Sequence, residues 1–99
     1  MTITAAQIQS ASQALRSVLR FDYPADSVLS RYFRDLRELG ARDRAFVAEA
    51  VYGVLRRLRT LERLCGEDVS TRKLVLAWLA RVDFAMKLWR AIGYDGRPT

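Results

Sequence analysis

Histidine is absent from this 99-residue chain, and cysteine occurs once, as Cys65. The chain therefore lacks the side chain that most often acts as a general base near neutral pH and most often ligates metals. A zinc site would have to be built from one thiolate and carboxylates, far from the Cys/His sets that zinc sites use. Cys65 cannot form an internal disulfide, and we interpret it as a small buried apolar side chain rather than a reactive thiol.

Other common signatures are also missing. The sequence contains no GxGxxG, Walker or GxSxG loop. No uninterrupted apolar run approaches the ~18 residues that a membrane span requires. Residues 1–15 have neither the basic start nor the long apolar centre of a secretory signal. We therefore expect a cytoplasmic protein with no membrane partner and no cofactor or metal site of its own.

The charge is strongly one-sided. The net charge is +6 and the pI is about 10.2. Residues 1–50 carry seven arginines against six acidic residues, whereas residues 51–99 carry ten basic residues against five acidic ones. A basic surface localised to half of a small domain favours a polyanionic partner, with RNA or DNA as the first candidates.

Apolar spacing predicts an all-α fold, because helical periodicity runs through the chain and no strand alternation occurs. The first helix is expected over 4–21, where Thr4 and Gln7 have capping-box spacing and Pro24 stops the helix. A second helix is expected from residue 25 or 26 to 39, with Gly40 as a left-handed C-terminal cap.

A third, long helix is expected over 42–64 or 42–65. Its apolar residues cover half of the circumference, so it is predicted to be the unbroken central helix of the bundle. Gly53 lies inside it, which indicates close approach of another backbone or of a ligand. Arg57 falls in the apolar arc and is interpreted as structural, either reaching past its neighbours to water or pairing with an acid.

The last helical region begins at a cap on Ser70 or Thr71. Apolar residues over 74–82 cover nearly the whole circumference and predict deep burial. Asp83 marks either a break or the middle of a continuous helix, because a further apolar stripe follows to Gly93. The prediction is a bundle of about five helices, or four if the last two are continuous, in one domain over 1–93. Residues 94–99 are expected to be a flexible tail.

A family resemblance is carried by residues 29–64, and most specifically by the run RDRAFVAEAVYGVLRR. This stretch resembles the N-terminal domain of bacterial 16S ribosomal RNA cytosine-5 methyltransferases, the Sun or Fmu family. That domain belongs to the NusB-like superfamily of helical, RNA-binding bundles. The resemblance implies a NusB-like bundle that helps a methyltransferase to engage ribosomal RNA.

The resemblance also implies that the chemistry lies elsewhere. Family catalysis uses two cysteines and S-adenosylmethionine bound by a separate α/β domain, and Cys65 matches neither cysteine motif. We therefore expect this chain not to be an enzyme by itself. It is interpreted as an N-terminal domain truncated before a missing methyltransferase domain, with S-adenosylmethionine implied only for that domain.

The expected RNA-binding surface lies on the polar side of the long helix. Arg56, Arg59 and Arg63 are spaced three and four apart, so their guanidinium groups should follow a phosphate backbone on one side. An exposed Tyr52 one turn earlier should stack an unpaired base. At the helix N-terminus, Arg42 and Arg44 are further candidates. The alternative is a protein-interaction module that binds a ribosomal protein, a transcription protein, its own catalytic domain or a second copy.

Overall fold

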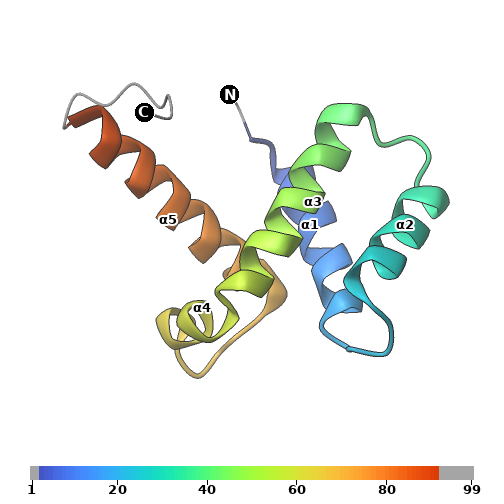
Figure 1. Ribbon diagram of the computed structural model, residues 1–99, viewed down its shortest axis with the longest axis horizontal. Helices are drawn as coiled ribbons and strands as arrows, with labels where there is room; N and C mark the ends of the chain where they lie inside the picture. The colour runs from blue at the N-terminus through green and yellow to red at the C-terminus, as the bar shows by residue number, and fades with distance from the viewer. Residues whose placement is uncertain (1–2, 92–99) are drawn as a thin grey trace.

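The structure, a computed structural model, describes the backbone of residues 3–91 and the side chains of residues 3–82. This part of the chain contains no strand, and its five helices are shown in Figure 1. They are α1 (Ala5–Val18), α2 (Ala25–Asp35), α3 (Ala41–Arg56), α4 (Leu58–Cys65) and α5 (Thr71–Ala91). The all-α, five-helix prediction is confirmed. The predicted end of the domain at 93 and the predicted flexible tail over 94–99 lie outside the described residues.

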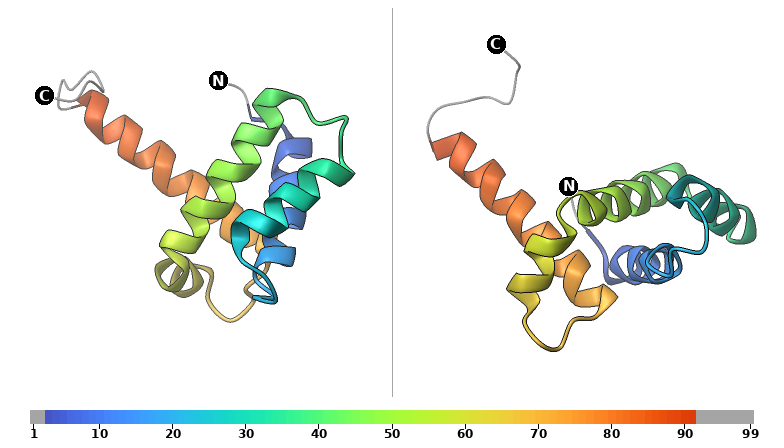
Figure 2. Two further views of the ribbon diagram at one scale, coloured as in Figure 1. Left: turned by 45° about the vertical axis from the view of Figure 1, so that its right-hand side comes forward. Right: turned by 60° about the horizontal axis from the view of Figure 1, so that its bottom comes forward.

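The bundle is centred on α1 and α3, which lie side by side (Figures 1 and 2). The helix α5 packs against both of them, α2 packs against α1, and α4 packs against α5. One apolar core joins all five helices. Its buried members are Ala11, Ala14, Leu15, Val18, Leu29, Phe46, Val47, Ala50, Val51, Val54, Leu61, Leu74 and Val75.

The start of α1 forms the predicted capping box. The hydroxyl of Thr4 accepts a hydrogen bond from the Gln7 amide at 3.1 Å, and the Gln7 side-chain carbonyl accepts from the Thr4 amide at 3.0 Å. The Gln7 side chain is buried, and its amide donates to the Asp43 carboxylate at 2.8 Å in the first turn of α3. One residue therefore caps α1 and ties it to α3.

Two predicted helix ends are wrong. The first helix ends at Val18 instead of Phe21, and Phe21 adopts a left-handed φ of 56° that no helix contains. The second ends at Asp35, four residues early, and its C-cap is Leu36. Gly40 has an extended backbone with φ −74° and ψ 172°, so it precedes α3 as its N-cap and is not a left-handed C-terminal cap.

The predicted unbroken central helix is also wrong. Arg57 has φ −127° and ψ 30°, which divides the segment into α3 and α4. A straight helix over 42–64 would be about 35 Å long, whereas the 14 residues of α1 span only about 21 Å. The turn at Arg57 instead folds the last two turns toward α5, where Leu61 is fully buried. Packing on a short partner thus overrides the local helical pattern.

The helix α5 is continuous through Asp83, so the bundle keeps five helices only because the central segment is divided. The Ser70 hydroxyl accepts from the Lys73 amide at 3.2 Å, which confirms the predicted cap. Burial around the whole circumference is not observed, since Leu76 is 41% and Val82 is 43% exposed. Figure 2 shows why: the second half of α5 extends away from the other helices.

Candidate nucleic-acid interface

The three arginines predicted to form one stripe are exposed, but they do not lie on one helix. Arg56 ends α3, whereas Arg59 and Arg63 belong to α4 beyond the turn at Arg57. The three-and-four spacing therefore no longer places their guanidinium groups in one row. The expected stripe is replaced by a bent surface.

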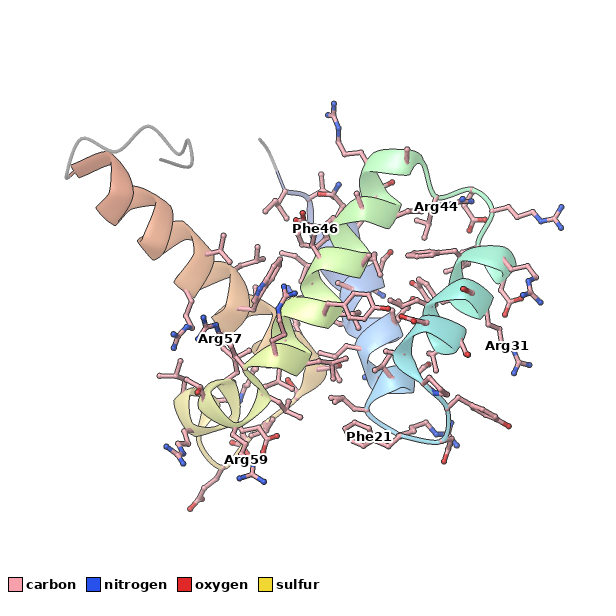
Figure 3. All side chains as sticks on the ribbon, in the orientation of Figure 1. Phe21, Arg31, Arg44, Phe46, Arg57 and Arg59 are labelled. Carbon is pink, nitrogen blue, oxygen red and sulfur yellow. The ribbon has the colours of Figure 1, made fainter. Side chains whose placement is uncertain are left out.

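Arg57 joins this surface, although its position in the apolar arc indicated a structural role. It is exposed at the turn. We call Arg56, Arg57, Arg59 and Arg63 together the α3–α4 corner. Figure 3 shows Arg57 beside α5 and Arg59 at the far side of α4, so the two side chains leave the corner in different directions. The exposure of Arg57 could have been predicted from a difference in length, because the predicted helix over 42–64 is longer than the first helix on which it packs.

The surroundings of the corner are also basic. From Val54 to Val82 the chain carries seven basic residues against three acidic ones, and every one of them is exposed. The other basic residues of this stretch are Arg72, Lys73 and Arg81 on α5. Because α4 packs on α5, these charges gather at one end of the molecule. In the described residues, no salt bridge involves any of them.

Tyr52 is not the open stacking platform that was expected. Its ring is half-buried against the core, and its hydroxyl donates a hydrogen bond to the Asp26 carboxylate of α2. That bond, followed by partial burial and the Asp26 charge, raises the pKa of Tyr52 above its ordinary value. Tyr52 therefore ties α3 to α2.

Arg42 and Arg44 are exposed at the other end of α3. Along the helix axis, Arg42 lies about 21 Å from Arg56, so the two basic regions are separate. The Arg44 guanidinium lies over the Phe33 ring, 6.0 Å from its centroid, which gives it a partner inside the molecule. Asp43 between them bonds to Gln7. This end of α3 thus has structural contacts that the α3–α4 corner lacks.

Two exposed aromatic side chains in the α1–α2 loop were not predicted from the sequence. Phe21 is 68% and Tyr23 is 67% exposed. The segment Asp22-Tyr23-Pro24 served only as a helix stop signal, although two aromatic residues separated by one acid in a loop are themselves notable. Of Tyr23 and Tyr52, it is therefore Tyr23 that is mostly exposed.

The described residues also bear on metal binding and on membrane crossing. They contain no cluster of histidine, cysteine, aspartate and glutamate side chains that could hold a metal. Cys65 is half-buried and packs against the core, in keeping with the apolar interpretation. None of the helices is sufficiently long and apolar, within the part of the chain that is described, to cross a membrane.

The geometry thus defines a small all-α bundle with a basic corner and an exposed aromatic loop. Comparison with known proteins gives no match to a family model, to a curated protein or to a solved structure.

Proposed function

We propose that this domain binds ribosomal RNA weakly, and with little sequence preference, through the α3–α4 corner. The observation that carries the proposal is the exposed arginine cluster at one end of the molecule, which forms no salt bridge with any acidic side chain among residues 3–82. Arginine suits this role because its planar fork grips two phosphate oxygens at once. Since the guanidinium groups leave the corner in different directions, we expect them to contact phosphates of a bent or folded RNA.

The biological setting that we propose is an accessory domain of an S-adenosylmethionine-dependent ribosomal RNA cytosine-5 methyltransferase. Its support is the sequence resemblance of residues 29–64, together with an all-α bundle of suitable size. In this setting the domain supplies RNA affinity, and the separate catalytic domain supplies the cofactor and the reactive cysteines.

The corner is tested by the triple charge reversal Arg56→Glu, Arg59→Glu and Arg63→Glu, with RNA affinity measured by fluorescence anisotropy on a ribosomal RNA fragment. Loss of three phosphate contacts should weaken binding strongly and reduce the slope of log K against log salt by about 2. All three positions are exposed, so the helical circular dichroism should not change.

A matched control reverses three exposed arginines elsewhere, Arg16, Arg34 and Arg37, which alters the net charge equally. We expect this control to retain most of the affinity. Equal losses in both triple variants would show that net charge alone governs binding and would reject the corner as the interface.

A protein-interaction module is the second candidate, and exposed apolar side chains near the corner favour it. Leu64 is 61%, Val69 is 43% and Leu76 is 41% exposed. Salt separates the two candidates. Phosphate-dominated binding weakens steeply between about 50 and 200 mM salt, whereas an apolar interface does not.

A further inference from the structure

The α1–α2 loop holds an aromatic residue in a strained backbone conformation. Phe21 has a φ of 56°, a left-handed value that bulky L-residues rarely adopt. Its ring gains little burial in return, because the residue is 68% exposed. A left-handed residue just after a helix helps to end it, and the Phe21 amide donates to the Val18 carbonyl at 3.0 Å. Glycine or asparagine usually takes such a position, and strain in a bulky residue also occurs at binding sites. The loop therefore merits a functional explanation.

Two open hollows lie at this loop, and Asp22 and Tyr23 line both. The first, of about 430 Å³, extends from Phe21 and Tyr23 to Leu55 in the last turn of α3. The second, of about 470 Å³, lies between the loop and α2. Figure 3 shows Phe21 at the same lower end of the molecule as Arg59. Leu55, at the far side of the first hollow, precedes Arg56 of the α3–α4 corner in the chain.

The second hollow combines three kinds of side chain. Tyr23 offers an exposed ring, Arg20 and Arg31 offer guanidinium groups, and Asp22 and Asp35 offer carboxylates. The pair between Arg20 Nε and Asp22 is loose, at 3.5 Å, with both side chains mostly exposed. Both groups are therefore available to a ligand.

Tyr32 also lines this hollow, but its hydroxyl already forms hydrogen bonds within the protein. Its hydroxyl donates to the Ser10 carbonyl at 3.1 Å and lies 3.3 Å from the Gln13 side-chain oxygen. Desolvation by burial is the main cause that raises the pKa of Tyr32. The groups left for recognition are thus one ring, two cations, two carboxylates and the hydroxyls of Ser17 and Ser27.

We propose that the second hollow binds one unpaired nucleotide of RNA, with guanine as the preferred base. This inference rests on the proposed RNA-binding function. The base stacks on Tyr23, and the adjoining phosphate contacts Arg20 or Arg31. A carboxylate of Asp22 or Asp35 accepts hydrogen bonds from the two adjacent N–H groups of guanine. Uracil presents only one N–H between two carbonyl oxygens, which repel a carboxylate.

The size of the hollow favours a nucleotide over a folded protein. Its volume lies in the range of small-ligand sites, about 300–1,000 Å³. A stable protein interface needs about 800 Å² from each partner. Asp22 and Tyr23 line both hollows, so we expect one RNA chain to extend from the loop toward the α3–α4 corner.

The test compares three RNA hairpins of equal length: fully paired, with one bulged guanine, and with one bulged uracil. The wild-type domain should bind the guanine bulge about tenfold more tightly than the paired hairpin, as expected for one stacked base. The uracil bulge should give a smaller preference. Tyr23→Ala should remove the preference for the guanine bulge without altering affinity for the paired hairpin.

Two further variants separate the roles. Tyr23→Phe keeps the aromatic face and should keep the preference. Replacing both carboxylates, Asp22→Asn with Asp35→Asn, should reduce the discrimination of guanine from uracil. Tyr23 is 67% exposed, so unchanged circular dichroism and thermal unfolding should accompany the loss of preference in Tyr23→Ala.

The failures of this inference and of the proposed function are distinguishable. Equal affinity for all three hairpins, still abolished by the charge reversal at the corner, would overturn the nucleotide site and leave the corner standing. A guanine-bulge preference that survives Tyr23→Ala would also overturn it. If a peptide occupies the hollow instead, Tyr23→Ala will leave every RNA affinity unchanged. No binding to any hairpin would overturn both proposals.

Discussion

Gly53 allows α3 and α5 to approach each other. A Cβ atom at this position would lie 2.6 Å from Cε2 and 2.9 Å from Cδ1 of the Trp78 indole. The Trp78 indole also packs edge-to-face on Phe46, with ring centroids 6.1 Å apart, and this contact holds it in place. The glycine within a helical pattern thus did indicate close packing, but a side chain rather than a backbone or a ligand takes the space.

Gly53→Ala is therefore expected to destabilise the domain. Alanine gains about 1 kcal/mol in helix propensity, but overpacking a fixed core contact costs about 1–3 kcal/mol. Urea unfolding followed by circular dichroism measures the net loss. In a Trp78→Leu background the clash is relieved, so the same change should become neutral or stabilising. An equal loss in both backgrounds would show that the indole is not the obstacle.

The Tyr52–Asp26 bond shows why a helical wheel predicted some site residues and missed others. The wheel places Arg56 and Tyr52 on the polar side of their helix, and both side chains do reach the surface region. A helical wheel contains no information on hydrogen-bond partners far away in the sequence. Asp26, the partner of Tyr52, lies 26 positions away. Exposure of charged side chains was therefore predictable, whereas the availability of the tyrosine was not.

Among the helices, starts with a local signal were predicted well. Thr4 with Gln7 and Ser70 with its following turn mark the starts of α1 and α5, because the capping bonds form between neighbours in sequence. Helix ends and helix breaks that depend on packing were not predicted. The separation of α3 from α4 follows from the length of α1 and the position of α5, and neither appears in the local pattern of residues 42–64.

The break at Arg57 has a measurable consequence in hydrogen exchange. A helix that starts at Leu58 leaves its first amide groups without acceptors inside the helix, and no capping side chain compensates. Protection resumes at Leu61, whose amide donates to the Arg57 carbonyl at 2.9 Å. Amides 58–60 should therefore exchange faster than amides 51–55 and 62–65 in NMR measurements.

The same experiment contains its own control. The amides of 41–43 open α3 in a comparable way, and protection there is expected to resume at Arg44, whose amide donates to the Gly40 carbonyl at 3.0 Å. Uniformly slow exchange from 51 to 65 would show a continuous helix in solution. That result would restore the straight arginine stripe and with it the original interface geometry.

At the scale of the whole molecule, the first half of α5 closes the bundle and the second half leaves it. Leu74 and Val75 are buried under α1, α3 and α4, whereas the helix axis carries later residues away from them (Figure 1). The sequence suggested full burial because apolar residues surround the whole helix. Apolar residues around a helix show that its surface favours burial, but not whether this chain supplies the residues that cover it.

Val75 and Val82 provide a matched pair for this arrangement. They are seven positions apart, hence on the same side of α5, but Val75 is fully buried and Val82 is 43% exposed. Val75→Ala should cost about 1.5–2.5 kcal/mol, from lost burial plus a cavity. Val82→Ala should change the free energy of unfolding by less than about 0.5 kcal/mol. Urea unfolding of both variants at low protein concentration measures the difference. A comparable cost at Val82 would mean that the second half of α5 is covered in solution, and the helix would then pack as closely as its apolar circumference predicts.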